Sequence, residues 1–299
     1  MEWDPTQFFR EDEAVSPRPF ALLVLNQPIN EIALAVLQKH ALITVCADGG
    51  ANRFFEWARS RGESIDPPTA IIGDLDSIRP EVREHYTKLG ASIIHDNDQY
   101  STDFMKSLRY IREHEKHILS SAPPSVGQNT DSDENQSLSI LVIGGLGGRV
   151  DQAFSQIHHL YIMNQNKTRG NGNGNVFLIS EESITFILQP GTNTIHVPRT
   201  NRPKPQPTHP NQPSPSLSEE DERGNYLLEE NVGIIPLSGP AHITTSGFEW
   251  DVEDWKTEIG GQLSTSNHIR AETVHVKTGV PVLFTLELAS RLKRGAGSR

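Results

Sequence analysis

Short apolar runs alternate with segments of helical periodicity between residue 20 and about residue 163. Such alternation is typical of βαβ units, in which helices cover a parallel sheet. We therefore predict an α/β domain with a mainly parallel sheet. Its five strands are expected in the runs ALLVLN, LITVCAD, TAIIGD, ASIIHD and LSILVIGG.

The pattern changes from about residue 175 onward. Here runs rich in β-branched residues are broken by turn residues, and no helical periodicity separates them. This texture is typical of an antiparallel β-sandwich. The runs are NVFLISE, SITFILQ, TIHVP, VGIIPLSG, HITTSG, TVHVKTG and PVLFTLEL.

These patterns divide the chain into an N-terminal tail, residues 1–19, an α/β domain, residues 20–170, and a β-sandwich domain, residues 171–299. A polar, glycine-rich linker, NQNKTRGNGNGN, separates the two domains. Residues 120–136 and 200–225 are rich in proline, serine and charge. Because they hold too few apolar residues to offset the entropy of ordering, we predict disordered loop insertions that the chemistry does not need.

Composition narrows the classes of partner. The 299 residues carry 38 acids against 27 bases, and a formal charge of −11 argues against nucleic acid or an anionic membrane as a partner. No apolar stretch approaches the ~18 residues of a membrane span, and the acidic N-terminus lacks the pattern of a signal peptide. The single cysteine, Cys46, favours a reducing compartment. We expect a soluble, cytoplasmic enzyme.

Acidic residues follow four of the five predicted parallel strands. The carboxyl ends of such strands meet at one edge of the sheet, where ligands bind. Two of the acids, Asp74 and Asp76, lie one residue apart and would repel each other without a cation, and Mg²⁺ prefers such ligands. A solvated turn is the simpler alternative for these two aspartates. The residues that follow the four strands are Asp48, Asp74, Asp96 and the pair Arg149 and Asp151.

The stretch DQYSTDFMKSLRYI predicts a helix that begins beside this edge. Ser101 or Thr102 is expected to cap it, and Asp103 and Lys106 then lie on its first turn. An ordinary helical ion pair would explain the spacing. Phosphoryl transfer also requires an acid that binds a cation beside a cationic group that binds phosphate, and a helix N-terminus binds anions.

The loop GGLGGRVDQ follows the fifth predicted strand. It is not a dinucleotide fingerprint, because Val150 stands where the third glycine should be, and it lacks the G-K-[ST] of a P-loop. Either it brings backbone close to a phosphate and presents Arg149 as a charge partner, or it is simply a tight turn between strand and helix.

Six segments along the chain form an ordered set of motifs: CADGGANRFFE, IIGDLDSI, DQYSTDFMKSL, GGLGGRVDQ, TTSGFEW and LSTSN. In this order they resemble the motifs of eukaryotic, fungal-like thiamine pyrophosphokinases. The resemblance covers nearly the whole chain outside the insertions and the tail. It implies a nucleotide-binding α/β domain followed by a thiamine-binding β-sandwich, which agrees with the pattern above.

The resemblance also implies roles for individual residues. Mg²⁺ would be held by Asp74, Asp76 and Asp103. The phosphates or the reacting hydroxyl would contact Gln99, Asp103, Lys106, Arg149 and Asp151, and the nucleotide would further involve Asp48 and Gln152. Thiamine would lie against Trp250, with Ser264, Ser266 and Asn267 lining the same pocket. Tyr100 replaces an acid that family members often carry in the motif D-Q-D-x-T-D.

The activity that this resemblance implies is transfer of the diphosphoryl group of Mg·ATP to the thiamine hydroxyl, with AMP as the second product. A homodimer with the active site at the subunit interface is implied as well. The general base stays open between Asp103 and Gln99. Two alternatives are a nucleotide-sugar glycosyltransferase, which also uses D-x-D to bind a metal diphosphate, and a non-catalytic nucleotide sensor.

Overall fold

The computed structural model describes residues 1–10, 17–62, 65–122, 137–165, 174–203 and 225–294. The chain forms two compact units. The α/β unit comprises Glu11–Glu181 with Arg294–Arg299, and the β unit comprises Met1–Arg10 with Glu182–Lys293. Most of the two predicted insertions, residues 123–136 and 204–224, lies outside the described residues, so their disorder stays a prediction.

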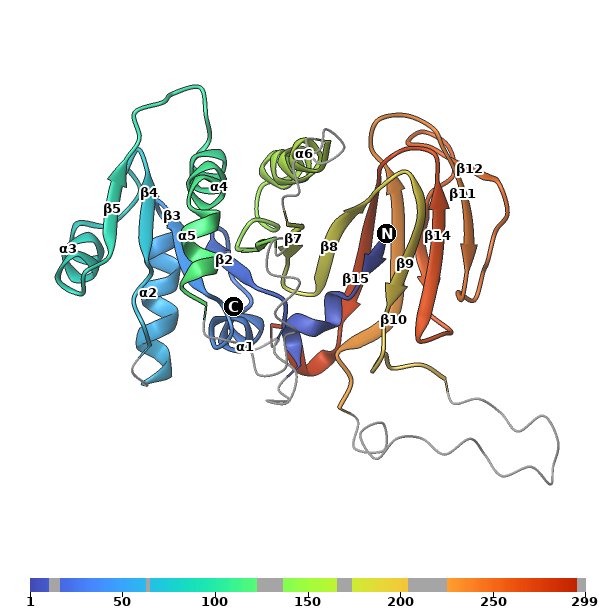
Figure 1. Ribbon diagram of the computed structural model, residues 1–299, viewed down its shortest axis with the longest axis horizontal. Coiled ribbons are helices and arrows are strands. Elements are labelled where there is room, and N and C mark those ends of the chain that lie inside the picture. Colours follow the sequence, from blue (N-terminus) through green and yellow to red (C-terminus); the bar gives the residue numbers. More distant parts are fainter. Residues whose placement is uncertain (11–16, 63–64, 123–136, 166–173, 204–224, 295–299) are drawn as a thin grey trace. The chain divides into compact units, whose positions relative to one another are not determined.

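The α/β unit is built on a parallel sheet with the strand order β7-β6-β2-β3-β4-β5 (Figure 1). Every residue of β2 and β6 is buried, as expected for central strands covered on both faces. The α/β class predicted from the sequence is therefore confirmed. The strands are β2 (Phe20–Val24), β3 (Ile43–Ala47), β4 (Ala70–Gly73), β5 (Ser92–His95), β6 (Ser139–Ile143) and β7 (Val176–Ile179).

The strand β7 differs from the expectation. Its sequence run was assigned to the antiparallel half, yet Val176 pairs in parallel with Ile140 of β6. All four residues of β7 are buried, which is what a parallel strand requires. The polar, glycine-rich stretch before β7 predicts a domain boundary near residue 170. The chain instead passes from the α/β unit to the β unit between Glu181 and Glu182.

Six helices accompany the described part of this sheet. Among them, α2 packs against β2 and β3, α4 against β3 and β4, and α6 against β7. The side chain of Thr102 accepts a hydrogen bond from the Met105 N–H, so Thr102 is the N-cap of α4, one of the two caps expected. The helices are α1 (Glu31–Gln38), α2 (Gly50–Arg61), α3 (Pro80–Lys88), α4 (Asp103–Glu113), α5 (Glu115–Ser120) and α6 (Val150–Gln165).

The β unit contains two groups of paired strands, ordered β1-β9-β14-β11-β12 and β13-β10-β15-β8. All the pairs are antiparallel except β1 with β9. The predicted antiparallel domain is therefore confirmed. Its strands are β1 (Glu2–Trp3), β8 (Ser183–Leu188), β9 (Gly191–His196), β10 (Leu228–Pro236), β11 (Ala241–Ser246), β12 (Trp255–Thr257), β13 (Ser264–His268), β14 (Thr273–Thr278) and β15 (Val282–Leu288), followed by the 3₁₀ helix Ser290–Leu292.

The first ten residues belong to the β unit and differ from the tail expected for residues 1–19. Trp3 is buried, its indole N–H donates to Asn193 Oδ1 at 3.0 Å, and its ring packs against Phe186. The 3₁₀ helix Pro5–Phe9 follows and buries Phe8 and Phe9. A two-residue strand gives no periodicity, so the sequence pattern could not reveal that the apolar side chains of this segment are held by the sheet.

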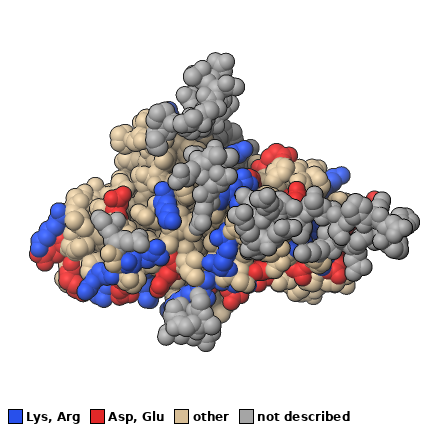
Figure 2. All heavy atoms as spheres, turned by 90° about the horizontal axis from the view of Figure 1, so that it is seen from below, with Lys and Arg blue, Asp and Glu red and all other residues tan. Residues whose placement is uncertain are grey.

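The described surface mixes charges of both signs. On the face drawn in Figure 2, Lys and Arg side chains lie among Asp and Glu side chains. Exposed pairs such as Lys88 with Glu84 contribute little to stability, because water screens them. Among the described residues, no helix combines the length and apolar character that a bilayer crossing requires.

Candidate functional site

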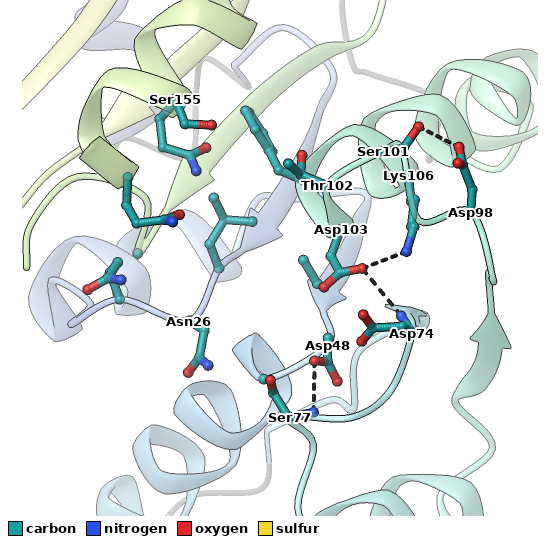
Figure 3. Close-up of a pocket in the computed structure, with 18 of the residues that line it drawn as sticks. Asn26, Asp48, Asp74, Ser77, Asp98, Ser101, Thr102, Asp103, Lys106 and Ser155 are labelled. Atoms are coloured by element: carbon teal, nitrogen blue, oxygen red, sulfur yellow. Dashed lines mark hydrogen bonds and ion pairs between the residues drawn. The ribbon is translucent and has the colours of Figure 1, made fainter. Parts of the chain in front are cut away.

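Three carboxylates meet at the carboxyl edge of the parallel sheet. Asp48 follows β3, Asp74 follows β4, and Asp103 opens α4. One oxygen of each lies within 4.8 Å of an oxygen of the others, and the three side chains point toward a common centre (Figure 3). Such a cluster of hard oxygen donors is suited to a divalent cation, since carboxylates this close would otherwise repel one another.

Asp48 also shapes the loop after β4. Its side chain is only 3% exposed, and its two oxygens accept hydrogen bonds from the N–H groups of Ser77 and Ile78, both at 3.0 Å. Burial raises the pKa of the Asp48 carboxyl, although these two N–H groups act in the opposite direction. Asp48 and Leu75 both have positive φ angles, 39° and 62°. Strained backbone of this kind is concentrated at functional sites.

Asp103 connects the cluster to a buried lysine. Its Oδ1 accepts hydrogen bonds from the Asp74 N–H at 3.3 Å and from Lys106 Nζ at 3.1 Å. The Lys106 side chain is 2% exposed, whereas that of Asp103 is 29% exposed. Burying an ammonium group is costly unless it is paired, and the ion pair with Asp103 supplies that partner here.

An open pocket of about 350 Å³ lies over these residues. In the sheet, β2 pairs with β3 on one side and with β6 on the other, so the direction in which the strands are connected reverses at β2. Ligands of open α/β sheets bind at such a point. The pocket is lined by Leu25, Asn26, Gln27, Ala47, Asp48, Gly49, Asp74, Ser77, Asp98, Gln99, Ser101, Thr102, Asp103, Phe104, Lys106, Gly144, Gln152, Ser155 and Gln156.

Other predicted residues lie elsewhere. Asp76 is exposed and is not part of the three-carboxylate cluster; its Oδ1 accepts a hydrogen bond from Ser77 Oγ. The Asp96 carboxylate, which was expected to converge with the others, instead forms an ion pair with Arg109 at 2.8 Å. The pKa of the Asp96 carboxyl is lowered, mainly because it accepts a hydrogen bond from the backbone N–H of Asp98 and also because it pairs with Arg109.

Arg149 and Asp151 are likewise outside the pocket lining. The guanidinium and the carboxylate form a two-bond pair at 2.6 and 3.1 Å, and the side chains are 75% and 63% exposed. The hydrogen bonds between them lower the pKa of the Asp151 carboxyl and raise the pKa of the Arg149 guanidinium. By contrast, Gln99 and Gln152 do line the pocket.

Sequence reasoning missed several lining residues. Asn26 and Gln27 lie one residue beyond the end of β2, so the rule that selected acids near strand ends would have selected them had it been applied to amides. Gly49 lies against Asn26, because a Cβ at this glycine would be 2.3 Å from Asn26 Nδ2 and the carboxamide would have to move. Gln156 lies in the middle of α6, and nothing in the helical pattern singles it out.

In the β unit, Trp250 and Asn267 are directly connected. Trp250 is 54% exposed, so it is not a core tryptophan. The Asn267 side chain is buried, accepts a hydrogen bond from the Trp250 N–H at 3.1 Å and donates one to the Trp250 carbonyl at 2.9 Å. The ring of His268 lies 5.0 Å from the Trp250 ring. Ser264 and Ser266 belong to the same strand as Asn267, β13.

A buried lysine beside clustered acids, at the point where the strand connections of a parallel sheet reverse, defines a phosphate-binding α/β protein of the phosphoryl-transfer type. Family models give the particular assignment. The catalytic domain of thiamin pyrophosphokinase matches residues 34–170, and the vitamin B1 binding domain of thiamin pyrophosphokinase matches residues 218–283.

Individual relatives agree. The chain is 31% identical to thiamine pyrophosphokinase 1 of Oryza sativa subsp. japonica over 304 residues, which covers 95% of this chain and 96% of the relative. Identity to the Saccharomyces cerevisiae thiamine pyrophosphokinase is 28%, over 82% of this chain and 78% of the relative. The solved structure of thiamin pyrophosphokinase from Candida albicans aligns with a TM-score of 0.71 and 30% identity, covering 96% of this chain and 92% of that one. The chain belongs to the thiamin pyrophosphokinase family.

Proposed function

We propose that this protein is a thiamine diphosphokinase, which transfers the diphosphoryl group of ATP to the hydroxyl of thiamine and releases AMP. The observation that carries this function is the family match, since one family model covers residues 34–170 and the other residues 218–283. A named relative in addition aligns with 95% of the chain. A glycosyltransferase or a nucleotide sensor is not favoured, because neither accounts for a match to the vitamin B1 binding domain.

The acid cluster fits the Mg²⁺ that we propose as the metal of the reaction. Asp48, Asp74 and Asp103 offer only oxygen donors, which suits a hard cation, and the pocket leaves room beside them for phosphate oxygens. When bound, Mg²⁺ would neutralise the charge on the phosphates during transfer. Asp76 stays a predicted ligand, and its exposed position makes it the least supported of the proposed ligands.

The proposed chemistry relies on positioning and charge. Lys106, whose ammonium group donates a hydrogen bond to Asp103 and lines the pocket, would contact the phosphates. Arg149 would contribute a second positive charge after exchanging its partner Asp151 for phosphate. Asp103 or Gln99 would take or orient the thiamine hydroxyl proton, and a loose phosphoryl transition state asks little of either.

The nucleotide product tests this function. In an ordinary kinase the γ-phosphoryl group is transferred and ADP leaves, whereas attack of the thiamine hydroxyl on the β-phosphorus must release AMP. We expect phosphorus NMR of a reaction with ATP, thiamine and Mg²⁺ to show thiamine diphosphate and AMP in equal amounts. Thiamine monophosphate together with ADP would contradict the proposal, and a mixture without thiamine controls for plain ATP hydrolysis.

Trp250→Ala tests the proposed thiamine site. If the exposed indole lies against the cationic thiazolium or the aminopyrimidine, its loss should weaken thiamine binding by about 1–2 kcal/mol through lost stacking and cation–π attraction. The affinity for ATP should barely change. Titration calorimetry with each substrate measures both effects. An equal loss for both substrates, with a much lower melting temperature, would instead indicate a packing role.

Asn267→Ala separates a ligand from a positioning residue. Because the Asn267 carboxamide is bonded to both backbone groups of Trp250, we expect it to hold the indole rather than touch thiamine. The variant should lose less thiamine affinity than Trp250→Ala and should change the fluorescence of the indole. The matched control is Trp255→Ala, which removes another indole of the β unit and should leave thiamine affinity unchanged.

We also propose a homodimer with the active site at the subunit interface, and a cytoplasmic location. Both proposals are supported by the family membership and by the sequence rather than by contacts within this chain. Sedimentation gives the mass in solution directly. Asp74→Asn chains mixed with Trp250→Ala chains, at a thiamine concentration too low to saturate the Trp250→Ala protein, should give more activity than the sum of the two separate proteins if each site draws on two subunits.

A further inference from the structure

Gln156 carries a buried acceptor without a partner. The residue is 8% exposed, and among the described residues no group donates a hydrogen bond to its Oε1. Buried polar atoms are nearly always paired, so such an atom indicates a missing donor. Several other buried side-chain atoms of the described chain also lack partners, but Gln156 Oε1 is the one among them whose residue lines the pocket of the acid cluster.

The surroundings of Gln156 are suited to a flat ring. Leu25 and Phe104, which are 6% and 3% exposed, contribute apolar walls to the same pocket. Leu25 and Gln156 both lie next to Gly145, because a Cβ at that glycine would be 3.1 Å from Leu25 Cδ1 and 3.4 Å from Gln156 Cγ. Apolar walls combined with a small number of polar groups that fix orientation are the usual form of a small-molecule site.

Gln156 and the phosphate-binding groups come from different elements. The acids and Lys106 follow β3, β4 and β5, whereas Gln156 comes from α6 after β6. In Figure 3, Ser155 of α6 lies across the pocket from Asp48 and Asp74. A substrate whose phosphates lie at the acid cluster could therefore place a ring some distance away, toward α6.

We propose that Gln156 is a specificity-determining residue whose Oε1 accepts a hydrogen bond from an amino group on a six-membered nitrogen heterocycle. The inference rests on the proposed function, because both substrates of that reaction carry this chemistry: the adenine of ATP and the aminopyrimidine of thiamine. With the Gln156 carboxamide in the orientation of the structure, an analogue with a carbonyl in place of the amine would set acceptor against acceptor, and a site built this way rejects it.

The test compares dissociation constants for two matched pairs of ligands. The first pair is ATP and inosine triphosphate, and the second is thiamine and its analogue with oxygen in place of the pyrimidine amine. In the wild type we expect one pair to be discriminated by at least about tenfold. Gln156→Leu should reduce that ratio to nearly one and raise the melting temperature, while Gln156→Glu, which keeps an acceptor, should retain the discrimination.

Gln189→Leu is the matched control. Its carboxamide is also buried and unpartnered among the described residues, but it lies in the β unit and does not line this pocket. Gln189→Leu should raise the melting temperature and leave the ratio of dissociation constants within each ligand pair unchanged. If Gln156→Leu changes the ratio of dissociation constants for ATP and inosine triphosphate, the group that Gln156 binds is adenine. If it changes the ratio for thiamine and its oxygen analogue, that group is the aminopyrimidine.

If Gln156→Leu changes neither ratio, the proposal is overturned. Calorimetry measures the dissociation constants without turnover. The binding test of Gln156 can therefore be read whether or not the protein forms thiamine diphosphate. A wild-type protein that forms no thiamine diphosphate would refute the function and leave the nucleotide pair readable.

Discussion

Asp74→Asn is expected to lower kcat by about 10³-fold or more, because it removes one of the clustered carboxylates proposed to hold Mg²⁺ beside the transferring phosphates. Without Mg²⁺ the variant should melt at a higher temperature than the wild type, since one of three mutually repelling charges is gone. The rise in melting temperature that Mg²⁺ causes in the wild type should largely disappear. Steady-state kinetics and thermal melts with and without Mg²⁺ measure these effects.

The neighbouring acids refine this test. Asp48→Asn should also lose turnover, but it should melt at a lower temperature, because an amide has one acceptor oxygen for the two N–H groups of Ser77 and Ile78. Asp76→Asn is expected to lose turnover as well. Full activity in Asp76→Asn would assign the ion to the clustered carboxylates alone, and full activity in Asp74→Asn would refute the metal site. Glu84→Gln, an exposed charge removed from the same unit, is the control.

Lys106→Met is expected to lower kcat by about 10²–10³-fold, since the buried ammonium forms an ion pair with Asp103 of the acid cluster and is proposed to stabilise charge on the transferring group. The melting temperature should stay the same or rise. Methionine fills a similar volume without the cost of burying a charge, and Asp103 is exposed enough for water to replace its lost partner. A gain in stability with a loss of activity is typical of a residue kept for function.

Lys88→Met is the matched control, because Lys88 is 71% exposed on α3 and pairs only with Glu84 among the described ion pairs. It should change neither turnover nor stability by much. Turnover of Lys106→Met close to the wild-type value would contradict the assigned role. A large fall in its melting temperature would show that the ion pair with Asp103 is mainly structural.

The sequence by itself determined the elements that local periodicity encodes. The apolar runs of β2 to β6, the cap at Thr102 and the change to an antiparallel texture are all properties of neighbouring residues, and the structure contains each of them. The position directly after a parallel strand also selected Asp48 and Asp74, because the carboxyl ends of such strands meet at one edge of the sheet, and the predicted helix start beside that edge selected Asp103 and Lys106. The same strand-end rule selected Asp96 and the pair Arg149 and Asp151, which are not part of the cluster.

Only the tertiary structure decided which side chains meet there. In the loop after β4, the left-handed turn at Leu75 separates Asp76 from the cluster, while the buried Asp48 joins it by accepting the N–H groups of that loop. The parallel pairing of β7, the anchoring of Trp3 and the unpartnered burial of Gln156 likewise depend on contacts between residues far apart in the chain. Periodicity reports which face of an element is apolar, but not what lies opposite that face, so the sequence pattern could not supply these contacts.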